Sequence, residues 1–176
     1  MRLDEAIAML DNSRFHPAPK MVWADLGCGS GTFTLALATL LPPESQIYAI
    51  DNNASALAQI PSFHHDVRIE KYNTDFLTEA LPFSMIDGIM MANALHYVEN
   101  KAAFLSKIIG HLKEKGCFLV VEYNTNSPVP LWVPFPVSFH RLTILFHDMG
   151  YKNVQLLGER NSLYGNGPLY AAIVTE

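Results

Sequence analysis

Val22-Trp23-Ala24-Asp25-Leu26-Gly27-Cys28-Gly29-Ser30-Gly31-Thr32 is the most informative segment of this 176-residue chain. A predicted apolar strand reaches the acidic residue Asp25, glycines follow at three alternate positions, and a helix begins at about Thr32. Glycine lacks a Cβ, so the backbone can turn sharply here and lie against a bound molecule. The helix would add free N–H groups and the positive end of its dipole. The segment therefore predicts a nucleotide-type binding site between a strand and a helix.

Strands and helices alternate around this segment. Helices are predicted at about residues 3–10, 32–41, 54–60, 100–112 and 138–149, and strands at about 21–26, 46–50, 67–72, 86–91, 117–122, 153–159 and 169–175. This alternation predicts a mostly parallel sheet that is covered by helices on both faces. Gly116 is expected to mark a turn, and residues 160–168 a loop. No helix fits between the last two strands, so we expect them to be antiparallel neighbours.

Length and composition indicate one globular domain over residues 1–176. Within it we expect an N-terminal helix or cap segment at 1–20 and a substrate-side loop at 124–137. The formal net charge is −5 without a basic cluster, which argues against nucleic acid or an acidic membrane as a partner. No apolar run approaches membrane-spanning length, the acidic start does not resemble a signal peptide, and the two cysteines lie in different contexts. We therefore expect a cytoplasmic protein.

Polar residues gather where the predicted strands end. They are Asp25, Asp51, Asp75, Asn93 and Glu122. Ligands of such sheets lie beyond the carboxyl ends of the strands. A carboxylate at Asp51, about 20 residues beyond the glycine turn, can accept hydrogen bonds from both hydroxyls of a ribose.

The glycine spacing argues against a dinucleotide. A dinucleotide fingerprint has its third glycine or alanine three residues after the second. Gly27 and Gly29 fit that pattern, but the next required position is Thr32, and the third glycine comes early, at Gly31. A turn of this kind suits a cofactor that lacks a pyrophosphate.

On these motifs the chain resembles the class I S-adenosylmethionine-dependent methyltransferases over nearly all of its length. Residues 24–31 look like the family's first motif, Tyr48-Ala49-Ile50-Asp51 like the second and Asn73-Thr74-Asp75-Phe76 like the third. Residues 91–98 are similar to the segment after the fourth strand, and Lys115-Gly116 to the turn into the fifth. The resemblance implies an α/β, Rossmann-like three-layer sandwich. Its sheet would have seven strands in the order 3-2-1-4-5-7-6, with the last strand antiparallel.

The resemblance also implies S-adenosylmethionine as cofactor, with S-adenosylhomocysteine as product. The residues expected to bind it are Asp25, Gly27, Cys28, Gly29, Gly31, Asp51, Asn52, Asp75, Phe76, Asn93 and Ala94. Asp51 would hold the ribose, Asp75 the adenine amino group and Asp25 the cofactor amine. The alternative roles are an N-cap for the next helix at Asp51, a capped turn at Asp75 and ordering of the glycine loop at Asp25. Cys28 is interpreted as a small residue, not a reactive thiol.

Methyl transfer from a sulfonium is an in-line displacement whose leaving group is neutral. The protein mainly aligns the reactants, and a base is needed only where the acceptor must lose a proton. The candidates for proton transfer are His96, Glu122 and Tyr123, which could instead be a packing histidine and solvated residues of the rim.

The stretch 129–137, with Trp132 and Phe135, is predicted to form an apolar wall or lid over the acceptor, together with His140. Packing on its own domain and a dimer contact are the alternatives. No metal site is expected: His64-His65-Asp66 lacks the spacing of a zinc pair and is interpreted as a surface loop.

The predicted function is S-adenosylmethionine-dependent methyl transfer to a small, partly apolar molecule, by a monomer or homodimer. Oxygen, nitrogen, carbon, sulfur and metalloid acceptors stay open. Asn93-Ala94-Leu95-His96 differs from the Asn-Pro-Pro-Tyr type of motif in amide and amino-base methylators, which disfavours nucleic-acid N-methylation. The alternative is a catalytically silent S-adenosylmethionine-binding or regulatory subunit.

Overall fold

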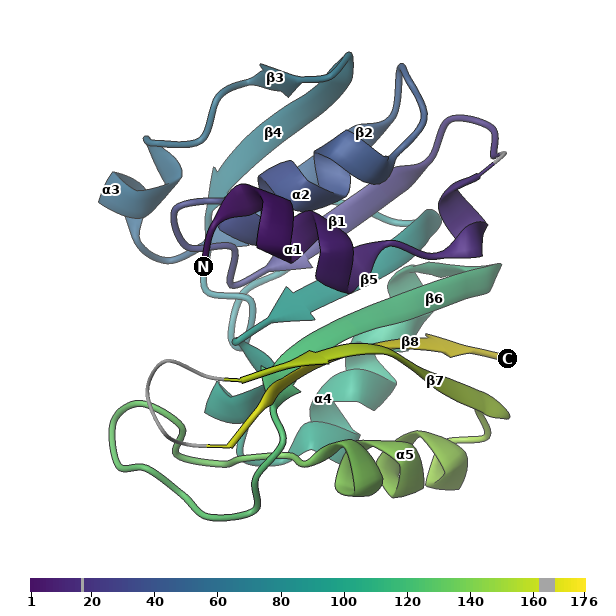
Figure 1. The fold of residues 1–176 in the computed structure, drawn as a ribbon. Helices are drawn as coiled ribbons and strands as arrows, with labels where there is room; N and C mark the ends of the chain where they lie inside the picture. The colour runs from purple at the N-terminus through teal and green to yellow at the C-terminus, as the bar shows by residue number, and fades with distance from the viewer. Residues whose placement is uncertain (17, 162–166) are drawn as a thin grey trace.

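A computed structural model describes residues 1–16, 18–161 and 167–176 (Figure 1). In this part of the chain one eight-stranded sheet has the order β3-β4-β2-β1-β5-β6-β8-β7. Its strands are β1 (Val22–Leu26), β2 (Gln46–Asp51), β3 (Phe63–His64), β4 (Val67–Asn73), β5 (Ile86–Ala92), β6 (Leu112–Tyr123), β7 (Asn153–Arg160) and β8 (Leu169–Thr175). The α-helices are α1 (Leu3–Leu10), α2 (Thr32–Leu40), α3 (Ala54–Leu57), α4 (Lys101–Ile108) and α5 (Phe139–Asp148).

The sheet confirms the predicted fold class. Strands β4, β2, β1, β5 and β6 pair in parallel, whereas β8 is antiparallel to both of its neighbours, β6 and β7. Without β3 the strand order is the predicted one. The carboxyl ends of the parallel strands therefore meet at one edge of the sheet, as the sequence analysis expects.

The predicted strand count is too low by one, because residues 63–68 form a hairpin. Phe63 pairs with Arg68, and His64 pairs with Val67, in antiparallel register. His65 and Asp66 between them both have positive φ, 48° and 61°. Two left-handed residues close a tight hairpin whose twist matches that of its strands. The interpretation of His64-His65-Asp66 as a surface loop is confirmed for His65 and Asp66, which form the exposed turn, and is wrong for His64, which ends an edge strand.

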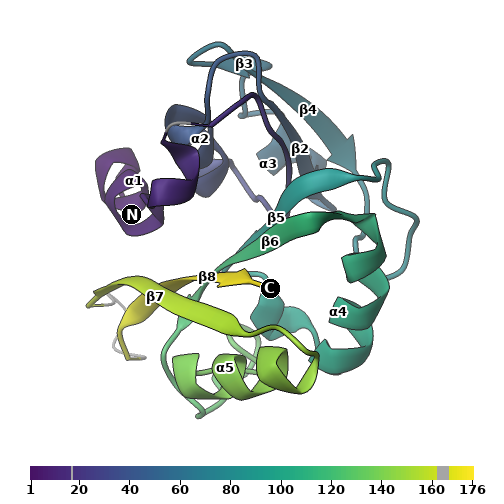
Figure 2. The ribbon, with the colours of Figure 1, turned by 90° about the vertical axis from the view of Figure 1, so that its right-hand side faces the viewer.

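Two cores lie on opposite faces of the sheet. Helices α1 and α2 cover one face, and α4 and α5 cover the other (Figures 1 and 2). Successive residues of β5 alternate between the cores: Met90 packs with the α1–α2 layer and Met91 with the α4–α5 layer. A strand buried on both faces needs the continuous apolar run that this segment has.

Several element boundaries differ from the prediction. α3 ends at Leu57 instead of Ile60, and α4 ends at Ile108 and continues as the 3-10 turn η3 (Ile109–His111). β6 begins at Leu112, and its register against β5 shifts between Leu112 and Cys117. The turn predicted at Gly116 is therefore wrong, because Gly116 lies in an irregular part of this strand. Of the loop predicted at 160–168, residues 162–166 lie outside the described part of the chain.

Candidate functional site

The glycine turn joins β1 to α2 in a conformation that requires glycine. Gly27, Gly29 and Gly31 have φ values of 76°, 54° and 90°. A Cβ on Gly27 would lie 2.7 Å from the Cβ of Ala94, and one on Gly31 would lie 2.7 Å from Cγ1 of Ile60. Any other residue at these two positions would therefore introduce both backbone strain and a steric clash. The Gly27 N–H donates to the carbonyl of Ile50 at 2.8 Å, which fastens the turn to the end of β2.

Two cavities adjoin this turn and share three of their lining residues, Gly27, Gly29 and Asn93. The larger cavity, of about 610 Å³, also has Asp51, Asn52, Asp75, Phe76 and Ala94 in its lining. The smaller, of about 320 Å³, is also lined by Asp25, Cys28 and Gly31. The structure thus brings together every residue that the sequence analysis assigns to the cofactor, along one cleft at the carboxyl ends of the strands.

Two residues that line the smaller cavity each have a buried side-chain oxygen without a hydrogen-bond partner among the described residues. These oxygens are Oδ1 of Asp25 and Oδ1 of Asn93. The other oxygen of Asp25 accepts a hydrogen bond from Oγ1 of Thr34 at 2.6 Å. Burial raises the pKa of Asp25 to about 7, the Thr34 bond opposes this rise and the charge of Asp51 adds to it. Unsatisfied buried acceptors are costly, so this end of the cleft suits a cation with N–H donors.

Asp51 connects the glycine turn to the segment after β2. Its Oδ2 accepts from the Gly29 N–H at 2.7 Å, and its Oδ1 accepts from the Asn53 N–H at 2.8 Å. The N-cap of α3 is Asn53, whose side chain accepts from the Ala56 N–H, so the alternative role of Asp51 as a helix cap is wrong. Each carboxylate oxygen keeps a second lone pair, with which it can accept a hydroxyl of a ligand.

Asp75 stands at the other end of the larger cavity. Its Oδ1 accepts from the Leu77 N–H at 2.9 Å, and its own N–H donates to Oε1 of Glu79 at 2.8 Å. The capped turn that the sequence analysis offers as an alternative is therefore present. The next residue, Phe76, lines the same cavity and packs edge-on against Phe104 of α4. This end of the cleft combines a carboxylate with an aromatic face, which suits a planar ring that carries an amino group.

His96, in the 3-10 turn after β5, and Glu122, near the carboxyl end of β6, form a buried pair. Nδ1 of His96 lies 2.7 Å from Oε2 of Glu122, and the His96 N–H donates to Oε1 at 3.0 Å. Both side chains are buried. The alternative interpretation of Glu122 as a solvated rim residue is therefore wrong. Tyr123, the third predicted residue for proton transfer, is partly buried, with its ring centroid 6.3 Å from that of His96.

The cleft as a whole fits S-adenosylmethionine. The unpartnered oxygens of Asp25 and Asn93 match its ammonium group, Asp51 matches its ribose diol, and Asp75 and Phe76 match its adenine. The fit rests on an observation of this chain: two buried acceptors are unsatisfied at the end where the cofactor would bring its donors.

A family model described as a methyltransferase domain matches residues 24–118, more than half of the chain. The chain belongs to this methyltransferase family. It is 29% identical over 103 residues to an uncharacterized methyltransferase of Mycobacterium tuberculosis (strain ATCC 25618 / H37Rv), an alignment that covers 58% of the chain and 51% of the relative. It is 26% identical over 117 residues to a trans-aconitate 2-methyltransferase of Pseudomonas paraeruginosa, over 66% of the chain and 40% of the relative. The methyltransferase thus spans about half or less of the length of these relatives.

Solved structures support the fold of this methyltransferase. A putative O-methyltransferase from Nostoc punctiforme superposes with a TM-score of 0.69 and 18% identity, over 99% of the present chain and 56% of the other. This likeness confirms the Rossmann-like arrangement that the sequence motifs imply.

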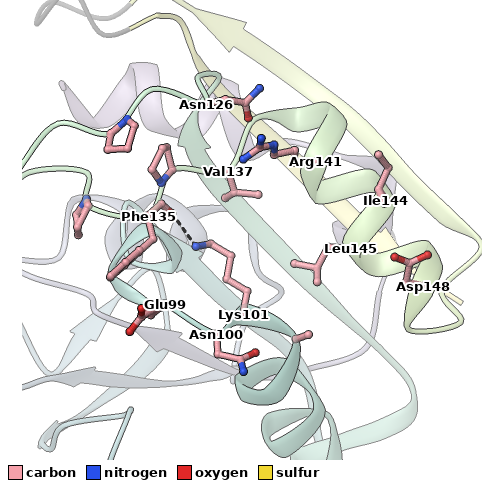
Figure 3. A pocket seen from close by; sticks show the side chains of 14 residues that line it. Glu99, Asn100, Lys101, Asn126, Phe135, Val137, Arg141, Ile144, Leu145 and Asp148 are labelled. Carbon is pink, nitrogen blue, oxygen red and sulfur yellow. Dashed lines mark hydrogen bonds between the residues drawn. The ribbon is translucent and has the colours of Figure 1, made fainter.

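The three residues predicted on the substrate side are not brought together at the cofactor cleft. Trp132 lies on a short turn between Val129 and Val133, with 68% of its surface exposed. Phe135 lines a separate cavity of about 940 Å³ between the start of α4, the loop after β6 and α5 (Figure 3). His140 is exposed on the first turn of α5. The two cofactor cavities are lined by none of these three side chains, so the predicted wall or lid stays a hypothesis about the loop.

The sequence analysis missed several residues of the cleft. The larger cavity is also lined by Asn53, Ala56, Thr74, Leu77 and Tyr97, and the smaller by Met1, Ser30, Thr32, Phe33 and Ala92. Most of them lie next to predicted residues in the sequence, and this adjacency could have been used to predict them. Met1 is different, since only the packing of α1 against α2 brings the N-terminal segment to this cleft.

The surroundings of Cys28 agree with its interpretation as a small residue of the turn. Burial raises its pKa far above the ordinary value, and the charges of Asp25 and Asp51 add to this effect. Both cysteines are free. Within residues 1–16, 18–161 and 167–176, no group of three or more histidine, cysteine or acidic side chains is placed to hold a metal ion. No helix in these same ranges has the length and apolar character needed to cross a bilayer.

Proposed function

We propose that this methyltransferase transfers the methyl group of S-adenosylmethionine to a small, partly apolar molecule, at an oxygen that must lose a proton. The observation that carries the proposal is the buried His96–Glu122 pair. His96 lies in the segment after β5, and its neighbours Ala94 and Tyr97 line the larger cofactor cavity. A base is unnecessary for an acceptor that already has a free electron pair and no proton to lose. A hydroxyl or an acid is the acceptor that makes use of such a pair.

S-adenosylmethionine supplies a methyl group on a positively charged sulfur, and the electron pair of the broken carbon–sulfur bond stays on that sulfur. In this chain Asp51 would hold the ribose, and Asp25 with Asn93 would hold the ammonium group. These contacts fix the cofactor before the acceptor arrives. Positioning of this kind lowers the barrier by about 7–11 kcal/mol in favourable cases.

The Glu122 carboxylate determines which nitrogen of His96 is basic. An ionised carboxylate only accepts hydrogen bonds, so Nδ1 carries the hydrogen of this bond, and in the neutral imidazole Nε2 then has the lone pair. Nε2 would take the proton of the acceptor hydroxyl while the acceptor oxygen bonds to the methyl carbon. Glu122 stabilises the resulting imidazolium without taking its proton, as a carboxylate does beside a catalytic histidine.

The names of two similar proteins and the net charge also support the proposal. One relative is named for trans-aconitate and one solved structure is described as a putative O-methyltransferase, which are a small molecule and an oxygen acceptor. The formal net charge of −5 disfavours binding to a nucleic-acid backbone.

Calorimetry tests the cofactor. We expect S-adenosylmethionine and S-adenosylhomocysteine to bind the wild-type chain, NAD not to bind, and Asp51→Ala to lose most of the affinity for both sulfur compounds. Tight NAD binding without a response to the sulfur compounds would contradict the proposal.

Transfer of a labelled methyl group tests the acceptor. A panel of small phenols, carboxylic acids, amines and thiols is offered beside a structured RNA. We expect label in an oxygen compound, with a rate that falls by about 10²–10⁴-fold in His96→Gln. His147→Gln, an exposed histidine on α5, is the matched control and should keep the wild-type rate. Cofactor binding without transfer to any of these compounds would favour the silent binding subunit, and label in the RNA would refute the small acceptor.

A further inference from the structure

Lys101 joins the loop after β6 to the segment that carries His96. Its Nζ donates to the carbonyl of Phe135 at 2.6 Å and to the carbonyl of Val98 at 2.8 Å (Figure 3). The same ammonium lies 5.9 Å from the centroid of the Phe135 ring. One cation on the first turn of α4 therefore holds two chain segments together.

Phe135 has a second bond to the same segment. Its N–H donates to the carbonyl of His96 at 3.0 Å. Both neighbours of Phe135 in the chain are prolines, Pro134 and Pro136, which have no N–H. Phe135 thus supplies the single backbone N–H of residues 134–136, and this N–H and its own carbonyl both bind within residues 96–101.

A cavity lies between this part of the loop and helices α4 and α5. The cavity of about 940 Å³ lies between Phe135, the start of α4 and the face of α5 that carries Arg141 and Leu145 (Figure 3). Earlier in the loop, the backbones of Val129 and Val133 hydrogen-bond to each other. Phe135 lines this cavity and is 36% exposed, so we infer that the two hydrogen bonds of its backbone carry much of its positioning.

These bonds also fix the backbone beside the Glu122–His96 pair, because Lys101 holds the carbonyl of Val98 and Phe135 holds the carbonyl of His96. Burial lowers the pKa of the Lys101 ammonium, and the charge of Glu122 opposes that fall. Glu122 is buried, and both of its carboxylate oxygens hydrogen-bond to His96. A nearby cation offsets part of the cost of burying that carboxylate.

We propose that Lys101 is a positioning residue, which clamps Phe135 against the His96 segment and supports the bond between Glu122 and His96. The expected effect on the KM for the acceptor rests on the proposed function of His96. The clamp itself does not, because it is a set of contacts within the chain.

Three variants test the clamp: Lys101→Met removes the cation and its donors, Lys101→Arg keeps both, and Lys107→Met is the control on the exposed face of α4. Hydrogen exchange of the Phe135 amide is measured in the full chain. We expect exchange about tenfold faster or more in Lys101→Met, as the loss of a charged hydrogen bond predicts, and near-wild-type protection in the other two. Thermal unfolding by circular dichroism establishes that each variant is folded.

The second readout is the proton NMR signal of His96 Nδ1–H, which a bond to a carboxylate moves far downfield. We expect it in the wild type, Lys101→Arg and Lys107→Met, and its broadening or loss in Lys101→Met. With an acceptor in hand, the KM for that acceptor should rise at least fivefold in Lys101→Met, with KM for the cofactor unchanged and rescue by Lys101→Arg.

Exchange and NMR need no methyl acceptor, so they separate this inference from the proposed function. If the chain lacks transferase activity but Lys101→Met still shows faster Phe135 exchange and loses the His96 signal, the clamp is supported and only the proposed function is refuted. Unchanged protection of Phe135 in folded Lys101→Met, or no rescue by Lys101→Arg, would overturn the inference even in an active enzyme.

Discussion

At the scale of a single residue, Asp25 is held in a state that costs stability. Its carboxyl group is fully buried and, among the residues that the structure describes, accepts one hydrogen bond, from Thr34. The folded pKa of about 7 lies above the ordinary value of 3.8, so the unfolded chain loses this proton at a lower pH than the folded chain does. The folded state therefore loses stability as the pH rises from about 4 to 7, and the whole cost is present above pH 7.

Asp25→Asn removes this cost but keeps an oxygen for Thr34. Above pH 7 we expect the variant to be more stable than the wild type by up to about 2–4 kcal/mol, with the difference vanishing near pH 4. Urea unfolding at pH 4, 6 and 8 measures this. A destabilised variant at pH 8 would contradict the expectation.

The same substitution tests the ligand role of Asp25. Because an ionised carboxylate is needed to hold an ammonium group, wild-type affinity for S-adenosylmethionine should fall below pH 7, by about tenfold per pH unit. Asp25→Asn should bind weakly at every pH. A wild-type affinity that is independent of pH between 5 and 8 would remove Asp25 from the site.

At the scale of elements, the turn between β1 and α2 shows why three glycines lie at alternate positions. Gly27 has positive φ, and its missing Cβ leaves room for Ala94 of the segment after β5. The close approach brings two strand connections together, and both line the larger cavity. The glycine is therefore needed for packing as well as for access by the ligand.

Gly27→Ala should lower the free energy of unfolding by about 1–3 kcal/mol and weaken cofactor binding, because the new methyl group meets Ala94 in a left-handed backbone. Chemical denaturation and calorimetry measure the two effects. Gly110→Ala is the matched control: it has an ordinary φ and no neighbour within 4 Å of its new Cβ. Equal losses in the two variants would show that the close approach to Ala94 is unimportant.

At the scale of the whole molecule, α1 is attached to the far edge of the sheet. Glu5 of α1 bonds to Arg160 at the end of β7, with Nη2 donating to Oε1 at 2.6 Å, and it also accepts the Arg2 N–H. The Arg160 bond in the first place, and then the Arg2 bond, hold the pKa of Glu5 near 2, below its usual 4.5. The ends of the chain are linked here over 155 residues.

Glu5→Gln should lower the Tm at pH 7, where Glu5 is ionised in both folded and unfolded chains and the pair is formed. The contribution of the pair is present above pH 4.5 and is lost as the pH falls toward 2, so the two Tm values should converge there. Differential scanning calorimetry across this range measures it, at low salt. A Tm difference that persists at pH 2 would show that lost packing, not the ion pair, is responsible.

The local pattern of the sequence was sufficient to predict the layers of the fold and most residues of the cleft. The alternation of apolar strands and helices, the glycines at 27, 29 and 31, and the acids after strands are all readable over a few residues. They predict a position in the structure because parallel strands place their carboxyl ends at one edge. Asp51 and Asp75 were found in this way.

The long-range pairs were decided only by the tertiary structure. His96 and Glu122 are 26 residues apart, and Lys101 and Phe135 are 34 apart. A helix lies between the first two, and a strand and a proline-rich loop between the others, so no sequence period connects them. The burial of Glu122, the unpartnered oxygen of Asp25 and the approach of Met1 to the cleft depend on which elements become neighbours. Those neighbours are selected by the packing of two cores against one sheet, which is a property of the whole chain.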